Sequence, residues 1–148
     1  MMRFLLFLIL NFGALFLGSL LMGNPADNTW YQQQDLAPWT PPGWVFGAAW
    51  FTIMLLFAIF LSKVLRKTSR KTEFWTLLSI HYVLNIAWNP LFFKWHWVGT
   101  ALLVLALLWI VVLLLWVRFR KAAGWTGWLL LPYLVWLVLA FSLNAFVV

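Results

Sequence analysis

Long apolar runs dominate this chain and decide what it can fold into. Each of five runs is close in length to the roughly 20 residues that cross the hydrocarbon core of a membrane. Only 9% of the 148 residues are charged and 66% are hydrophobic, so a soluble body of this size would leave too much apolar surface in water. The pattern predicts an all-α membrane protein, a bundle of five transmembrane helices in one domain over residues 1–148. The predicted spans are residues 4–22, 45–62, 74–93, 98–117 and 125–147.

The residue types that are scarce or missing exclude several classes of protein. There is no cysteine, which excludes disulfides, thiolate metal sites and cysteine nucleophiles. The acidic residues Asp27, Asp35 and Glu73 lie outside the runs, so no carboxylate is placed for a proton relay, a sodium site or a pair of catalytic acids. We therefore expect no metal site, no catalytic residues of the usual hydrolytic kinds and no obligatory cofactor.

The ten basic residues are divided unevenly between the two ends of the predicted bundle. Nine belong to the end that holds the N-terminus: Arg3, those within residues 63–71 and those within residues 118–121. The opposite end has only Lys94. By the positive-inside rule we expect a cytoplasmic N-terminus and a C-terminus outside. The net charge of +7 then reflects orientation and contact with lipid headgroups, and we expect no binding of nucleic acid.

Residues 23–44, between the first two runs, form a connection that is long for a compact protein. Prolines restrict its backbone, and large amphipathic rings are spread along it. These residues are Pro38, Pro41 and Pro42, and Trp30, Tyr31, Trp39 and Trp44. One interpretation is an aromatic belt that anchors the connection among lipid headgroups. The other is a lid that partly closes a pocket, which the stiffening by proline favours.

Polar and aromatic residues recur on one helix face in the third and fifth runs. The first set is His81, Asn85 and Trp88, and the second is Tyr133, Trp136, Ala140 and Asn144. At 1.5 Å per residue, most of these positions, and Trp50 of the second run, lie in the half of the membrane beneath the long connection. The convergence of rings and amides at one depth predicts a ligand pocket there.

Several of these residues also have a purely structural interpretation. An Asn inside a span can hydrogen-bond to a neighbouring helix, which accounts for Asn85 or Asn144, taken singly, as well as a ligand contact does. His81 could ligate haem or a metal, but a lone His without acidic or Cys partners favours a hydrogen bond within the bundle. The Gly43-x-x-x-Gly47 pattern is compatible with a dimerisation face, although the preceding proline pair favours a role in starting the helix.

Ordered blocks of Trp, Tyr, Pro and Asn cover nearly the whole chain. They are Trp30-Tyr31, Trp39-x-Pro41-Pro42-x-Trp44, Trp50, Asn85-x-x-Trp88-x-Pro90-x-Phe92-Phe93, Pro132-Tyr133-x-x-Trp136 and Leu143-Asn144. In order and spacing these blocks resemble the TspO/MBR family, the tryptophan-rich sensory or translocator proteins. The resemblance implies a bundle of five transmembrane helices, often dimeric, and we expect a homodimer.

The resemblance also implies an outer-facing pocket for flat hydrophobic ligands, above all porphyrins and haem, closed by the first connection. Carried over residue by residue, its lining is Tyr31, Trp39, Trp50, Asn85, Trp88, Trp136, Ala140 and Asn144. Four more residues are candidates for the same pocket: Phe46, His81, Phe92 and Tyr133.

The chain departs from the family pattern in two places. Gln34, Leu36 and Ala37 stand where the family usually has Leu and Lys-Pro, so a basic residue that could meet a porphyrin carboxylate is missing. After Asn144 there is no Tyr and basic residue of the proposed cholesterol motif. Sterol binding is therefore not supported, and we expect a protein of a prokaryotic cell membrane.

The function that the resemblance implies is that of a membrane receptor or carrier for porphyrin or haem-type tetrapyrroles, in transport, sensing or stress regulation. Tryptophans would stack on the macrocycle, while Asn85 and Asn144 would orient it. One alternative is light-dependent porphyrin breakdown, an activity attributed to some relatives, with Trp50 and Trp136 in electron transfer. Another is a membrane assembly protein without a small ligand, in which Trp109 could face lipid or a second subunit.

Overall fold

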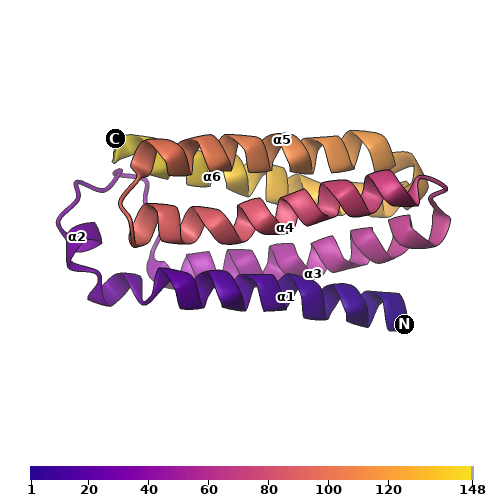
Figure 1. The fold of residues 1–148 in the computed structure, drawn as a ribbon, viewed down its shortest axis with the longest axis horizontal. Coiled ribbons are helices and arrows are strands. Elements are labelled where there is room, and N and C mark those ends of the chain that lie inside the picture. The colour runs from indigo at the N-terminus through magenta and orange to yellow at the C-terminus, as the bar shows by residue number, and fades with distance from the viewer. Residues whose placement is uncertain (148) are drawn as a thin grey trace.

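Five long helices lie side by side in the computed structural model, which describes residues 1–147 (Figure 1). They are α1 (Met2–Met22), α3 (Gly43–Lys67), α4 (Lys71–Phe93), α5 (Val98–Ala123) and α6 (Leu131–Phe146). Three short helices complete the chain: η1 (Pro25–Asp27), α2 (Thr29–Gln32) and η2 (Gly124–Leu130). Because the described residues hold no strand, the predicted all-α class is confirmed.

Helical stretches that are long and apolar enough to cross a membrane are found at three places in residues 1–147. They are Met2–Asp27, Gly43–Lys67 and Val98–Phe146, the last of which spans α5, η2 and α6. α4 is not among them, because polar residues such as His81, Asn85 and Asn89 interrupt its apolar sequence. Of these, His81 and Asn85 are buried inside the bundle. The polar side of α4 therefore faces the other helices.

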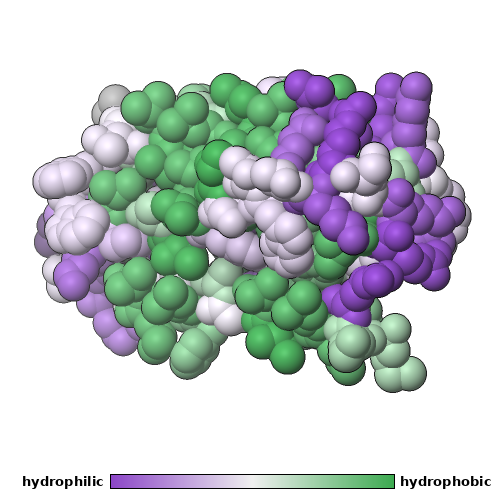
Figure 2. All heavy atoms as spheres, turned by 45° about the vertical axis from the view of Figure 1, so that its right-hand side comes forward, coloured by the Kyte–Doolittle hydropathy of each residue, from purple (hydrophilic) through white to green (hydrophobic). Residues whose placement is uncertain are grey.

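Most of the charged residues gather at one end of the bundle. Figure 2 shows hydrophilic side chains at the end that holds the α3–α4 and α5–η2 connections, next to a broad hydrophobic surface. Glu73 at the start of α4 lies 3.8 Å from Arg70 and 3.4 Å from Arg118 of α5. We call the end that holds these ion pairs the basic end. The opposite end, which holds α2, is called the cavity end, because a cavity lies there.

Two helices extend beyond the predicted apolar runs at the basic end. α3 continues to Lys67 and α5 to Ala123, whereas the runs end at residues 62 and 117. Basic side chains occupy the last turn of both helices, where they interact favourably with the unpaired carbonyl groups. Hydropathy detects only the apolar part of a helix and so places these ends too early.

The fifth predicted run, residues 125–147, is not one continuous α-helix, and this detail of the prediction is corrected by the structure. Its first part is η2, and α6 starts at Leu131, one residue before Pro132. Proline is favoured in the first turn of a helix. η2 also packs tightly on α5: a Cβ at Gly127 would lie 3.2 Å from the carbonyl oxygen of Arg120. η2 and the end of α5 are therefore in close contact at Gly127.

Large apolar side chains fill the space between the helices towards the basic end. The fully buried ones include Phe57, Phe60, Leu61, Val64, Phe74, Leu78, Leu115 and Phe119. For example, the ring of Phe74 contacts the rings of Phe7 and Phe119 edge-on, with ring centroids 6.0 Å and 5.7 Å apart. Such edge-to-face contacts between close-packed rings stabilise the bundle.

A buried amide joins three helices at the middle of the bundle. Asn11 of α1 donates from Nδ2 to the carbonyl oxygen of Met54 in α3 at 3.0 Å. The hydroxyl of Tyr82 in α4 donates to Asn11 Oδ1 at 2.6 Å. Both polar atoms of the amide are therefore paired, and the contact fixes the register of α1 against its two neighbours.

Candidate functional site

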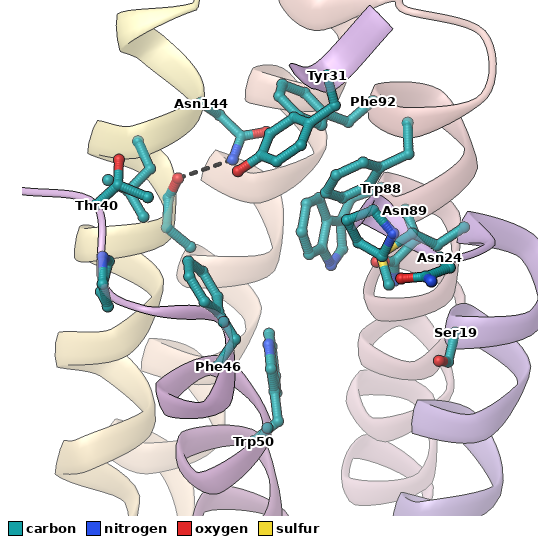
Figure 3. Close-up of a pocket in the computed structure, with 18 of the residues that line it drawn as sticks. Ser19, Asn24, Tyr31, Thr40, Phe46, Trp50, Trp88, Asn89, Phe92 and Asn144 are labelled. Carbon is teal, nitrogen blue, oxygen red and sulfur yellow. Dashed lines mark hydrogen bonds between the residues drawn. The ribbon is translucent and has the colours of Figure 1, made fainter. Parts of the chain in front are cut away.

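A cavity of about 720 Å³ lies at the end of the bundle opposite the basic residues. It is enclosed by α1, α3, α4 and α6 and by the connection that holds η1 and α2 (Figure 3). Its volume is within the range of about 300–1,000 Å³ that is usual for sites of small organic ligands. None of the described residues that line it is charged. The cavity is therefore suited to a largely apolar molecule.

Aromatic rings form two facing sides of the cavity. Phe46 and Trp50 of α3 contact Trp136 of α6 edge-on, at 5.5 Å and 6.4 Å between ring centroids. Trp88 and Phe92 of α4 lie on the other side (Figure 3). Because edge-to-face contacts have a preferred geometry, the rings of the first group hold one another in place.

Three polar atoms in the cavity wall have no hydrogen-bond partner among the described residues. They are Nε1 of Trp88, Nε1 of Trp136 and Oδ1 of Asn144. The other polar atom of Asn144, Nδ2, donates to the carbonyl oxygen of Ala140 at 3.0 Å, shown as the dashed line in Figure 3. Buried polar groups without a partner are rare and costly. Two N–H donors and one acceptor are thus unpaired, and each of these atoms is itself buried in the wall.

Two amides of α4 lie at the side of the cavity nearest α1. Asn85 is buried in the wall, and its side chain makes no hydrogen bond to another described residue. Asn89 donates from Nδ2 to the carbonyl oxygen of Asn85 at 3.3 Å. Its amide also lies against Gly18 of α1, where a Cβ would come within 2.8 Å. Gly18 therefore permits the close approach of α1 and α4 that closes this side.

The connection over the cavity is attached to the end of α4. Asn28 caps α2 by accepting from the backbone N–H of Tyr31 at 3.0 Å, and its Nδ2 donates to the carbonyl oxygen of Phe93 at 2.8 Å. Tyr31 lines the cavity and packs against the ring of Phe93 at 5.3 Å. Burial raises the pKa of the Tyr31 hydroxyl above its usual value, so this hydroxyl stays protonated at physiological pH, as an ordinary Tyr also does.

A second contact fixes the same helix on the α4–α5 connection. The ring of Trp30 in α2 stacks on His96 at 4.2 Å with an interplanar angle of 17°, and meets Phe92 edge-on at 5.5 Å. His96 has a positive φ of 57°, a backbone conformation that non-glycine residues rarely adopt. The stacked pair therefore depends on a local conformation that holds His96 under the indole.

Most of the predicted site residues line this cavity. They come from the first connection and three helices that are far apart in the sequence: Tyr31, Phe46, Trp50, Asn85, Trp88, Phe92, Trp136, Ala140 and Asn144. The fold thus brings them together around one space, and their contact with a ligand stays a prediction.

Trp39 is the predicted site residue that lies away from the others. Its side chain is 52% exposed. Its Nε1 donates to Oγ of Ser142 at 3.2 Å, and its ring meets Phe146 edge-on at 5.5 Å. Trp39 is not among the residues that line the cavity, and in this structure it attaches the first connection to α6.

His81 and Tyr133 also lie outside the cavity, beneath it. His81 Nε2 and the hydroxyl of Tyr133 are hydrogen-bonded at 2.8 Å, and both residues are fully buried. Tyr133 meets Trp50 edge-on at 5.9 Å, so the pair supports a ring of the cavity floor. Within residues 1–147, no three His, Cys, Asp or Glu side chains are grouped so that they could hold a metal ion.

α1 forms one side of the cavity, although none of its residues was among the predicted site residues. Ala14, Leu15, Ser19 and Met22 line it there, as do Gly43 and Gly47 on α3. The sequence did contain a signal: Asn11, Ala14 and Gly18 recur on one helix face, and the structure buries all three. Small residues on a buried helix face permit a close neighbour or leave free space, and the sequence alone does not distinguish the two.

Comparison with known proteins finds a matching family and several similar proteins. The sequence model of the TspO/MBR family matches residues 5–148. The chain is 32% identical over 133 residues to the tryptophan-rich protein TspO of Chlorobaculum tepidum, covering 87% of this chain and 83% of that protein. It is 31% identical over 125 residues to protein CrtK of Rhodobacter capsulatus, covering 80% and 76%. It is likewise 31% identical over 119 residues to the translocator protein of Ovis aries, covering 78% and 70%.

Proposed function

The chain belongs to the TspO/MBR family, and we propose that it is a membrane receptor or carrier that binds a porphyrin or haem-type tetrapyrrole in the cavity described above. Its apolar helices and its family make it a multi-pass membrane protein. One observation carries the proposal: an uncharged cavity of about 720 Å³ has aromatic rings on facing sides and unpaired N–H and C=O groups in its wall.

A flat macrocycle matches both features of the cavity. Its faces and edges can contact the rings of Trp50, Trp88 and Trp136 in offset or edge-on geometry. The unpaired atoms of Trp88, Trp136 and Asn144 can pair with polar atoms near the ring. Because no charged side chain lines the described wall, the carboxylates of such a ligand would extend towards the first connection and water.

Substitution of the cavity tryptophans tests this proposal. We expect Trp50→Ala and Trp136→Ala each to weaken protoporphyrin binding by about tenfold, since stacking of a flat base on an aromatic side chain contributes about 1–3 kcal/mol. Trp128→Ala is the matched control, because this indole is exposed at the basic end and should leave affinity unchanged. Affinity is measured by quenching of tryptophan fluorescence in detergent, with protoporphyrin, haem and a sterol titrated in parallel.

Binding can be interpreted only for variants that are folded. Circular dichroism and size-exclusion chromatography show whether each variant retains the helical bundle. If both folded variants bind protoporphyrin as the wild type does, the cavity is not the binding site. If the wild type binds the sterol and neither tetrapyrrole, the ligand class is wrong.

We also propose that α1, α3, α4, α5 and η2 with α6 each cross the membrane once. Nine of the ten basic residues at one end of the bundle support a cytoplasmic N-terminus in a prokaryotic cell membrane. The chain has no cysteine, so single cysteines can report sidedness. In intact cells a membrane-impermeant thiol reagent should label Gln33→Cys and not Ser69→Cys. The reverse pattern would invert the topology.

The homodimer that the family resemblance implies is likewise a proposal. Native mass spectrometry of the protein released from detergent measures the number of chains directly. A species with the mass of two 17.3 kDa chains is the expected result. A monomer at all protein concentrations would exclude a stable dimer.

A further inference from the structure

Four of the eight glycines have a structural reason to be glycine: Gly23 and Gly124 have positive φ, and a Cβ at Gly18 or Gly127 would lie within 3.2 Å of a neighbouring residue. Gly43 and Gly99 lie in the first turn of a helix, where glycine costs less than in a helix interior. Gly13 of α1 and Gly47 of α3 remain. Both are inside helices, and a Cβ at either would meet nothing within 4 Å. Since glycine destabilises a helix relative to alanine, neither backbone geometry nor packing explains these two.

Gly47 differs from Gly13 in its position relative to the cavity. Gly47 lines the cavity, one residue after Phe46 and three before Trp50, whereas Gly13 does not line it. Figure 3 shows the rings of Phe46 and Trp50 extending from this part of α3. At Gly47 the surface of the cavity is therefore bare backbone between two aromatic side chains.

The neighbouring helix α1 also has small side chains in the cavity wall at this level. α1 and α3 run in opposite directions, and the hydrogen bond between Asn11 and Met54 sets their register. Residues 14–19 of α1 therefore lie at about the level of residues 46–51 of α3. Ala14, Leu15 and Ser19 line the cavity there. Two of these three side chains are small, so α1 leaves space beside the aromatic rings at Ala14 and Ser19, as α3 does at Gly47.

We propose that Gly47 is a specificity-determining residue, because its missing side chain leaves the cavity wide enough for a large flat macrocycle. This inference rests on the proposed function and specifies the shape of the ligand. A side chain at position 47 would narrow the cavity and leave the aromatic rings in place. The narrowed cavity would exclude a wide macrocycle and still accept a small flat molecule.

The test compares Gly47 with Gly13, using Gly→Ala and Gly→Leu at each position. Protoporphyrin serves as the wide probe and 2-naphthol as the small one. We expect Gly47→Leu to weaken protoporphyrin binding by at least tenfold, Gly47→Ala to weaken it about threefold, and neither to change naphthol binding by more than about twofold. The Gly13 variants should bind both probes as the wild type does.

Stability gives a second readout that does not depend on any ligand. A Cβ at position 47 or 13 has free space, and alanine stabilises a helix relative to glycine. Gly47→Ala and Gly13→Ala should therefore each raise the midpoint of denaturation in detergent. A more stable variant with weaker protoporphyrin binding is the expected signature. Lower stability of Gly47→Ala would show that packing requires the glycine and would overturn the inference.

The remaining outcomes separate this inference from the proposed function. If the wild type binds protoporphyrin and a folded Gly47→Leu binds it equally well, the inference fails and the function stands. If Gly47→Leu loses both probes equally, or Gly13→Leu loses protoporphyrin to the same extent, selection by width at Gly47 is wrong. If the wild type binds naphthol and no tetrapyrrole, the proposed function fails and the inference fails with it.

Discussion

The two ends of the bundle use the space between the helices differently. Towards the basic end, Phe74 and Phe119 are fully buried and contact each other, and Phe57 and Phe60 are likewise buried and in contact. At the cavity end, the same helices α3 and α4 surround about 720 Å³ of free space. Because dense packing supplies most of the stabilising contacts inside a protein, the basic end holds the bundle together and the cavity end can tolerate a void.

Polar groups and glycines show the same difference. Near the basic end, Trp116 Nε1 donates to the carbonyl oxygen of Gly127 at 3.0 Å, and a Cβ at Gly127 would crowd the backbone of Arg120 in α5. At the cavity end, Trp136 Nε1 has no partner and Gly47 has unused space beside it. Of the five buried side-chain atoms without a partner among the described residues, three therefore belong to residues of the cavity wall, and the other two belong to His81 and Trp109 outside it.

The largest expected difference between the two ends is in core phenylalanines. Phe74→Ala should lower the free energy of unfolding by about 3–5 kcal/mol, because it opens a cavity among close-packed rings. Phe46→Ala should cost less than about 1 kcal/mol, because Phe46 is only partly buried and already borders free space. Unfolding in mixed micelles with increasing SDS measures both. Equal losses would show that the two ends are packed alike.

The next difference concerns the buried pair beneath the cavity. Tyr133→Phe removes the hydroxyl that pairs with His81 Nε2 and should lower stability by about 2 kcal/mol, because it leaves a buried ring nitrogen without a partner. Tyr31→Phe is the control at the cavity end, where the hydroxyl makes no hydrogen bond to another described residue. Its effect should stay below about 0.5 kcal/mol. A reversed order in the same unfolding assay would contradict this account.

Alanine at two glycines should change stability in opposite directions. Gly127→Ala places a Cβ against the backbone of Arg120 and should cost about 1 kcal/mol. Gly47→Ala should add about 0.5–1 kcal/mol of helix stability. Denaturation midpoints of the two variants, measured side by side, give the sign directly. If both variants changed stability in the same direction, the two ends of the bundle would not differ in how much space they leave beside a glycine.

The smallest effect is expected in the connection over the cavity. His96→Ala removes the ring that stacks on Trp30 and should increase amide exchange across Thr29–Gln32 by about fivefold, corresponding to about 1 kcal/mol. Global stability should not change. Trp95→Ala is the control, since Trp95 is exposed and contacts Trp97 instead. Exchange that rises equally in both variants would show that the stacked pair does not hold α2.

Much of the fold could be predicted because the membrane restricts the alternatives. Apolar runs marked the positions of the long helices, and the charge pattern separated the two ends. Within each helix, periodicity placed Asn85 with Trp88, and Trp136 with Asn144, on one face, and the structure turns both faces to one cavity. The 3-10 segment η2 was missed, because hydropathy along residues 125–147 does not distinguish a 3-10 helix from an α-helix.

The sequence by itself therefore determined which segments are helical and apolar, and which face of each carries rings and amides. Only the tertiary structure decided which polar atoms find partners: it paired His81 with Tyr133, attached Trp39 to α6, and left Trp88, Trp136 and Asn144 with unpaired atoms. The physical reason is that helix periodicity is a local property of the chain. Hydrogen-bond partners and free space depend on how separate helices rotate and approach one another.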